Sequence, residues 1–201
     1  MSDGSKIPKY TVEHVTPISW VNLTSMIYEF RHVQSDPVCI LIAEGTDNQT
    51  RGNQPLAFSN TAPTGTFAPW PNPLAHVERV AAVARIVCYS ALTYPCIANS
   101  ISTGSSPPSL DKSGVTNVKE YAQQIDEIVE LASMEPAEWE LEIALQVKAR
   151  FGICNPLVVS ERVRAALAGR SGTLYALLFA RLSGSALTDR ALVRAIVAVT
   201  S

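Results

Sequence analysis

The sequence predicts an all-α protein with a helical core domain over residues 20–160, an extended N-terminal arm over residues 1–19 and a C-terminal helical extension over residues 161–201. Apolar residues recur at helical spacing in several stretches, for example within residues 118–134. Helix-capping serines and threonines, and helix-ending glycines, lie between these stretches. Helix breakers gather instead in a few loops, and residues 45–73 contain five prolines and three glycines.

Capping residues and apolar spacing place the expected helices along the chain. We expect helices over residues 18–30, 74–98 with a break before Pro95, 118–134, 136–151 ended by Gly152, 161–168 capped by Ser160, 173–183 and 189–199. Residues 37–43 are apolar and leave two interpretations open: a helix capped by Asp36 with Pro37 in its first turn, or a strand. Residues 45–73 would form a long irregular loop, which is often functional or a subunit contact.

The N-terminal arm is predicted to be extended and to bind a neighbouring copy of the chain. Pro8 and Pro17 break helices, and residues 11–15 alternate as an extended segment does. An arm this short gains little by packing on its own domain, so we expect it to dock on another subunit. The side chains that would make this contact are Ile7, Tyr10, Val12 and Val15.

Length and composition fit one globular domain. The chain has 201 residues, of which 47% are apolar, and this suffices for a sizeable core. It contains no run of 18 or more apolar residues, and its first residues lack an apolar signal core, so we expect no membrane partner and no secretion.

Reactive side chains form no cluster in the sequence. The four cysteines lie far apart among apolar neighbours, as buried reduced thiols do. We find no zinc motif, acid–base pair, nucleophile motif or glycine-rich phosphate loop. We therefore expect no enzymatic activity, no metal or other cofactor and no small-molecule substrate.

Charge is distributed unevenly along the chain. Residues 120–142 contain eight acids and no lysine or arginine, whereas residues 148–194 contain eight bases against two acids. Such asymmetry indicates a polyanionic partner, self-association of unlike surfaces, or two solvated faces of opposite sign in one monomer. Within the basic block, Arg162, Arg164 and Arg170 are candidates for secondary contacts with a polyanion such as RNA, or for contacts between subunits.

Arg85 is the sharpest candidate for a binding residue. It lies in the apolar run Val80–Cys88, so its guanidinium is not expected to be fully solvated and needs an anion. We interpret Arg85 as a ligand of RNA phosphate that Asp126 helps to hold. The alternative is an ion pair within the chain, for example with Asp126, that binds no ligand.

Three local motifs resemble, in order, those of the coat proteins of flexuous filamentous plant viruses, most closely the potexvirus-like family. Gly45–Thr50 is similar to that family's Gly-Ser-Ser-x-Gln-Thr segment, and Ala81–Cys88 resembles the helix that carries its Arg-x-x-Cys. Ser105–Pro108, followed by Gly114, Lys119 and Asp126, resembles its Ser-Pro-Pro loop and the helix after it.

The resemblance implies a helical subunit that coats single-stranded RNA, through phosphate and irrespective of sequence, in a flexible filament of its own copies. It implies localisation to the virion and the host cytoplasm. The family's RNA pocket uses a serine, an arginine and an aspartate, and here Arg85 and Asp126 match two of them. Thr46, or Asp47 in the literal register, stands at the serine position, where only threonine keeps the hydroxyl. An aromatic for base stacking is missing beside Asp126.

Two other functions remain open from the sequence. One is a nucleoprotein of a segmented RNA virus, which would sequester RNA in a deeper groove. The other is a non-viral helical scaffold or adaptor protein. Long flexible rods in electron micrographs would favour the coat protein, rings the nucleoprotein and monomers the scaffold.

Overall fold

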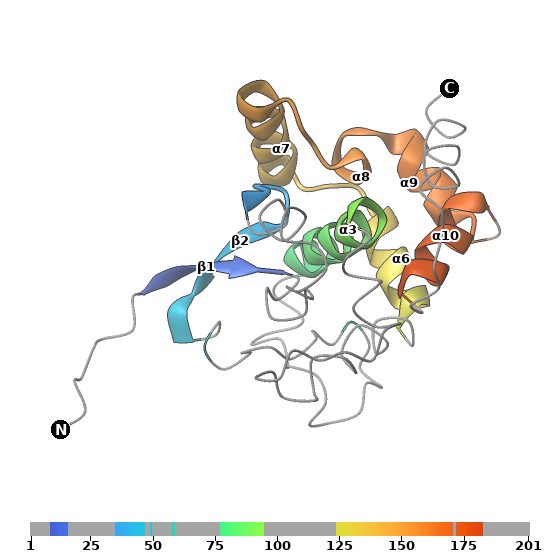
Figure 1. Cartoon of the computed structure of the whole chain (residues 1–201), viewed down its shortest axis with the longest axis horizontal. Helices are drawn as coiled ribbons and strands as arrows, with labels where there is room; N and C mark the ends of the chain where they lie inside the picture. The colour runs from blue at the N-terminus through green and yellow to red at the C-terminus, as the bar shows by residue number, and fades with distance from the viewer. Residues whose placement is uncertain are drawn as a thin grey trace.

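A computed structural model of the chain describes residues 9–15, 35–46, 49, 58, 77–94, 124–170 and 172–182. The described part contains, in chain order, β1 (Tyr10–His14), β2 (Ile40–Glu44), α3 (Val77–Thr93), α6 (Ile125–Ser133), α7 (Glu138–Phe151), α8 (Pro156–Val159), α9 (Glu161–Ala168) and α10 (Thr173–Leu182) (Figure 1). Expectations that lie outside these residues are the helices over 18–30 and 189–199, most of the loop over 45–73, the Ser105–Pro108 loop with Gly114 and Lys119, and the sites at Ile7 and Asp47.

The described chain is mainly helical, as predicted, but it is not all-α. β1 and β2 form a two-stranded antiparallel sheet in which Val12 lies opposite Ile42. β1 confirms the extended conformation expected for the arm. β2 decides the open interpretation of residues 37–43 in favour of a strand, since isoleucine favours the pleated conformation once a partner strand is present.

Helix α3 lies at the centre of the molecule and is buried along most of its length. It packs against α6, α8 and α10, and α6 in turn packs against α9 (Figure 1). Alanines and valines occupy every side of α3 from Val80 to Ala91, which lets its neighbours approach from several directions. α9 and α10 contribute Leu167 and Leu178 to the same hydrophobic cluster. The predicted extension therefore belongs to the core up to Leu182, because α9 and α10 bury apolar faces against it.

Local signals placed several helix ends correctly, although α6 begins at Ile125 rather than at residue 118. Gly152 ends α7 with a φ of 76°, and its N–H donates to the Lys148 carbonyl at 2.9 Å. Ser160 caps α9 by accepting a hydrogen bond from the Val163 N–H at 3.4 Å. Pro136 differs from the prediction, since it precedes α7 rather than lying in its first turn.

The described part of the arm packs on its own chain. The expectation that all four of its apolar contact residues bind a neighbouring copy is therefore wrong for Val15. The Val15 N–H donates to the Cys39 carbonyl at 3.1 Å, and the Val15 side chain is 0% exposed within the core cluster. Tyr10 and Val12 are exposed, as the docking hypothesis requires. The difference follows from the strand pairing, which brings Val15 over the core and turns Tyr10 and Val12 outward.

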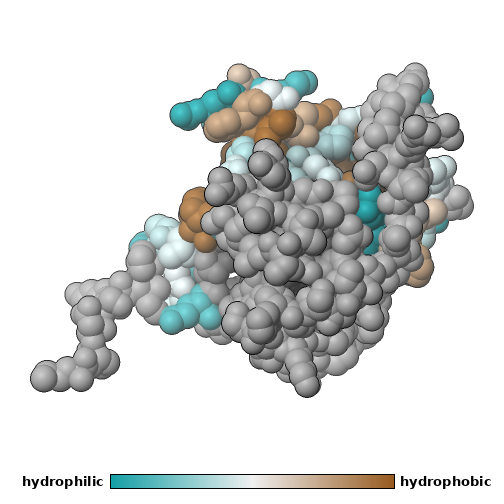
Figure 2. All heavy atoms as spheres, viewed as in Figure 1, coloured by the Kyte–Doolittle hydropathy of each residue, from teal (hydrophilic) through white to brown (hydrophobic). Residues whose placement is uncertain are grey.

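Helix α7 differs from the others because most of its side chains are exposed. Figure 2 shows hydrophobic and hydrophilic side chains side by side at the top of the molecule, where α7 lies. None of the helices that the structure describes is both long enough and apolar enough to cross a membrane.

Candidate functional site

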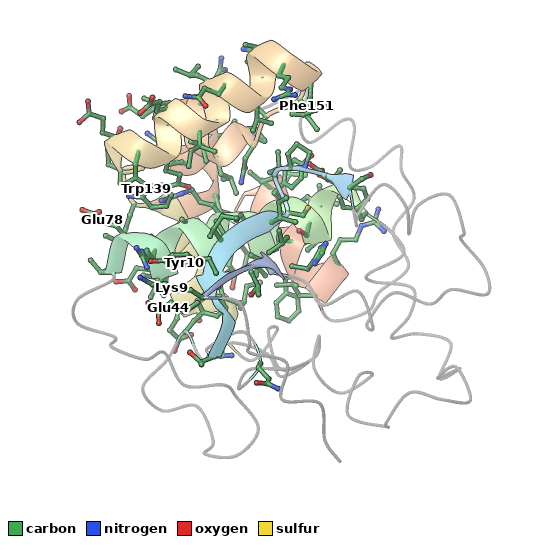
Figure 3. All side chains as sticks on the ribbon, turned by 90° about the vertical axis from the view of Figure 1, so that its left-hand side faces the viewer. Lys9, Tyr10, Glu44, Glu78, Trp139 and Phe151 are labelled. Carbon is green, nitrogen blue, oxygen red and sulfur yellow. The ribbon has the colours of Figure 1, made fainter. Side chains whose placement is uncertain are left out.

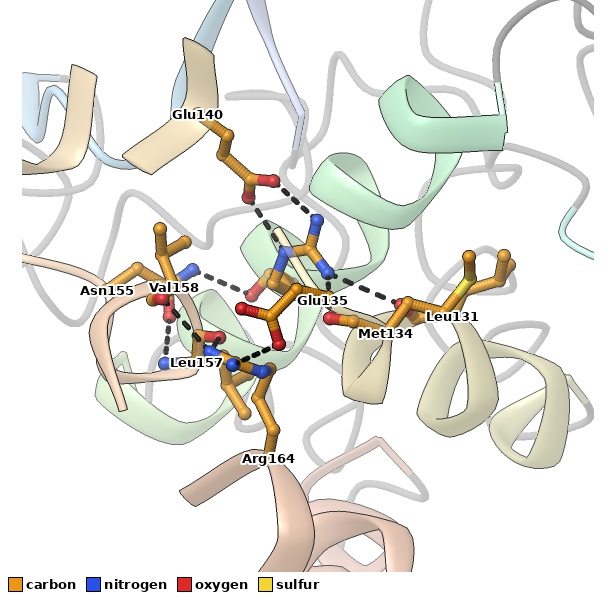
Figure 4. Close-up of polar contacts among 9 residues, drawn as sticks. Leu131, Met134, Glu135, Glu140, Asn155, Leu157, Val158 and Arg164 are labelled. Carbon is orange, nitrogen blue, oxygen red and sulfur yellow. Dashed lines mark hydrogen bonds and ion pairs between the residues drawn. The ribbon is translucent and has the colours of Figure 1, made fainter. Parts of the chain in front are cut away.

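Arg85 lies on α3 with 0% of its surface exposed, and its guanidinium is paired with a carboxylate. Its Nε donates to Glu140 Oε1 at 2.8 Å, and its Nη2 donates to Glu140 Oε2 in a second short contact (Figure 4). The planar fork thus meets both oxygens of one carboxylate, the geometry in which arginine binds carboxylates and phosphates most strongly. The prediction that Arg85 needs an anion is therefore confirmed, and Glu140 supplies it.

The remaining edge of the guanidinium meets the C-terminal end of α6. Arg85 Nη1 donates to the Met134 carbonyl at 2.9 Å, with the Leu131 carbonyl at 3.5 Å. Carbonyls at a helix end lack partners within the helix and carry the negative end of its dipole, so a cation is favourable there. The backbone of Arg85 takes part as well, because Asn155 Nδ2 donates to its carbonyl at 3.1 Å. Arg85 thereby joins α3, α6, α7 and the cap of α8.

Asp126 does not contact Arg85, which corrects the predicted pairing. It lies on the exposed flank of the first turn of α6, whereas Arg85 meets the other end of that helix. Asp126 Oδ1 accepts a hydrogen bond from Tyr175 at 3.2 Å and lies 3.7 Å from Arg170 Nη1. Burial, and then the hydrogen bond to Asp126, raise the pKa of Tyr175.

The other candidate RNA ligands differ in burial and in their partners. Arg164 is buried: its Nη1 donates to the Val158 carbonyl at 3.0 Å and its Nη2 pairs with Glu135 at 2.8 Å, so it holds the end of α8. Arg162 and Thr46 are exposed. Arg170 is half exposed and lies near Asp126 and Glu130. The structure therefore brings Arg170 and Asp126 together but does not assemble the predicted pocket.

Acids of residues 120–142 pair with arginines of the same chain. Glu140 neutralises Arg85, Glu135 pairs with Arg164, and Asp126 and Glu130 lie near Arg170. Two arginines of the basic block, Arg164 and Arg170, thus lie near acids of the acidic block within one monomer, so these parts of the blocks are not two separate solvated faces. The exposed members of these pairs stabilise the fold by roughly 0–1 kcal/mol each.

A second buried acid, Asp36, escaped notice as a site because the sequence indicated only a helix cap. Its Oδ1 accepts from the Val38 N–H at 2.8 Å, so it caps a turn before β2. Its Oδ2 accepts from Tyr89 at 2.9 Å and from Tyr94. Burial first, and then Asp36, raise the pKa values of both phenols. This cluster connects the segment before β2 to the end of α3. Both carboxylate oxygens of Asp36 already accept hydrogen bonds within the chain, which indicates a structural role.

The buried cysteines give a test of the core. Burial raises the pKa of the Cys39 thiol to about 12 and that of Cys88 to about 12. Because a raised pKa keeps the thiol protonated at pH 8, and the thiolate is the reactive form, we expect iodoacetamide to label the partly exposed Cys154 at least ~100 times faster than either. Peptide mass spectrometry of the native protein measures the three rates. Equal rates in the native protein would contradict the burial, whereas guanidinium should equalise them.

Neither a metal site nor a similar protein identifies a further functional residue in the part of the chain that the structure describes. No group of three or more His, Cys, Asp and Glu side chains suited to a metal ion occurs among the residues whose positions are described. No protein-family model, curated protein or solved structure matches the chain.

Proposed function

We propose that this protein is the coat protein of a flexuous filamentous virus, which polymerises into a flexible helical filament and encapsidates single-stranded RNA. The observation that carries the proposal is the ordered series of motifs at Gly45–Thr50, Ala81–Cys88 and Ser105–Asp126, which resembles the order in that family. Such a protein would reside in the virion and the host cytoplasm, with RNA and its own copies as partners.

Phosphate binding at Arg85 would require a change at α7. The Glu140 carboxylate now occupies the face of the guanidinium that a phosphate would use, and Arg85 has no exposed surface. A phosphate offers the same paired oxygens as a carboxylate, so it could replace Glu140 if α7 moved away. Arg162 and Arg170 would need no such movement, because both are solvent-accessible.

We expect sequence-tolerant RNA binding that weakens steeply with salt. A coat must cover every part of a genome, so its contacts are to phosphate and sugar, and the logarithm of the association constant should fall linearly with the logarithm of salt concentration. Fluorescence anisotropy with unrelated single-stranded RNAs measures this, and electron microscopy of the same mixtures should reveal flexible rods. A hundredfold difference between unrelated RNAs would contradict encapsidation.

The exposed arginines can be tested in the same assay. Changing Arg162 and Arg170 to glutamine should reduce RNA affinity and flatten the salt dependence by about 0.7 unit of slope for each phosphate that the variant no longer neutralises. Lys9→Gln with Arg79→Gln removes the same charge from two exposed positions outside the candidate set and serves as the control. If both double variants lose affinity equally, the two arginines have no particular role.

A helical scaffold or adaptor protein is the second candidate. The exposed apolar residues of α7 favour it, since unpartnered apolar surface is typical of a protein-binding element. A scaffold would give monomers or small oligomers in micrographs whether or not RNA is added. Rings with bound RNA would instead favour a segmented-virus nucleoprotein.

A further inference from the structure

Helix α7 carries more apolar surface than its packing uses. Its side chains are all described, and among them Glu140 alone is buried, where it pairs with Arg85. Apolar residues nevertheless occur on nearly every side of the helix, from Trp139 to Phe151, which label its two ends in Figure 3. Charged and amide side chains alternate with these apolar residues along the helix. α7 therefore exposes several large apolar side chains that the described part of its own chain leaves unpacked.

One side of α7 has the pattern of a helix–helix contact. Glu138, Leu141, Leu145 and Lys148 follow one another at intervals of three, four and three residues, which places them along one side of the helix. We call these four residues the α7 stripe. Leu141 is 40% exposed and Leu145 is 51% exposed, while Glu138 and Lys148 are exposed at the two ends. The stripe thus has two leucines at its middle, an acid at its first turn and a base at its last.

We propose that the α7 stripe binds the α7 stripe of a second copy in an antiparallel, twofold-symmetric dimer. Antiparallel pairing about the midpoint of the stripe sets Leu141 against Leu145 of the other copy. The same register sets Glu138 against Lys148 of the other copy, and symmetry makes each contact occur twice. A parallel pair would instead bring like charges together at both ends. The charge order of the stripe and the opposed helix dipoles therefore select a second copy in the antiparallel direction.

This dimer is a state of the RNA-free protein and does not depend on the proposed coat function. A twofold contact closes on itself after two copies. Subunits along one RNA strand all point the same way, so neighbours in such a filament are not related by a twofold axis. Because the contact rests on a single short helix, we expect a reversible dimer of micromolar affinity.

Sedimentation equilibrium of the full chain without RNA measures the dimer. We expect Leu145→Glu to weaken dimerisation at least ~100-fold, because it sets a carboxylate against Leu141 of the other copy. Leu145 is exposed, so the variant should keep the parent's circular dichroism spectrum. Gln146→Glu adds the same charge to an exposed position on another side of α7 and should leave the dimer intact.

A charge exchange tests the direction of the pair. Glu138→Lys alone and Lys148→Glu alone should each weaken the dimer about three- to tenfold and reverse its response to salt, because each change sets like charges against one another. The two changes together should restore it, because the antiparallel register again joins opposite charges. A parent that stays monomeric at high concentration, a dimer that survives Leu145→Glu, an open polymer, or an exchange that gives no rescue would each overturn the proposal.

Discussion

Replacing Arg85 with alanine should lower the free energy of unfolding by about 3–5 kcal/mol, because it leaves Glu140 as an unpaired carboxylate in the interior. The substitution also removes the donor to the Met134 carbonyl at the end of α6. Chemical denaturation followed by circular dichroism measures this effect. Arg79→Ala removes an exposed arginine from the same helix and should change stability by less than about 0.5 kcal/mol.

A double variant separates this structural role from RNA binding. Arg85→Met with Glu140→Leu replaces the buried pair by apolar side chains of similar size, a change that is often neutral or stabilising. We expect it to recover most of the stability that Arg85→Ala loses. If Arg85 also contacts phosphate, the recovered protein should still bind RNA more weakly than the parent. A single Arg85→Ala variant as stable as Arg79→Ala would contradict the buried ion pair.

The sequence predicted the chemistry of Arg85 but not its partner. An arginine inside an apolar helical run needs an anion in whatever fold the chain adopts. The local sequence was therefore enough to predict this requirement. Whether Asp126 or Glu140 pairs with Arg85 depends on which end of α6 lies against Arg85. The spacing of apolar residues identifies the buried face of a helix but not the element that packs against that face. Glu140 also lies between Trp139 and Leu141, in a helix where this one acid is buried while most of the large apolar residues are exposed. This arrangement reverses the usual pattern and gives no signal in a single sequence.

In the fold as well, features set by local interactions were predictable and features set by long-range contacts were not. The C-terminal end of α7 and the N-terminal end of α9 were predictable because Gly152 and Ser160 each cap the helix next to them. The strand at Ile40–Glu44 was not, because a short apolar run fits either a helix or a strand. Pairing with β1 decides the matter, and β1 lies well before β2 in the chain. The place of Val15 in the core follows from that pairing and so was missed as well.

Deleting residues 1–15 should destabilise the whole protein and not only remove a contact between subunits. The deletion removes the partner of β2 and the Val15 side chain from the core. Burial of a valine contributes about 1.5–3 kcal/mol, and each strand hydrogen bond about 1 kcal/mol more. We therefore expect the free energy of unfolding to fall by at least about 3 kcal/mol, with a matching decrease in the denaturation midpoint.

Two point variants locate the effect within the arm. Val15→Ala should lower the free energy of unfolding by about 2 kcal/mol, because Val15 is fully buried beside α3. Val12→Ala, on the outward face of the same segment, should change it by less than about 1 kcal/mol. If Val12 instead binds a neighbouring copy, its variant should assemble poorly while unfolding at nearly the parent's midpoint. Equal stability of the truncated and full-length chains would show that the strand pair does not support the core, and the arm would then be free to serve a neighbour alone.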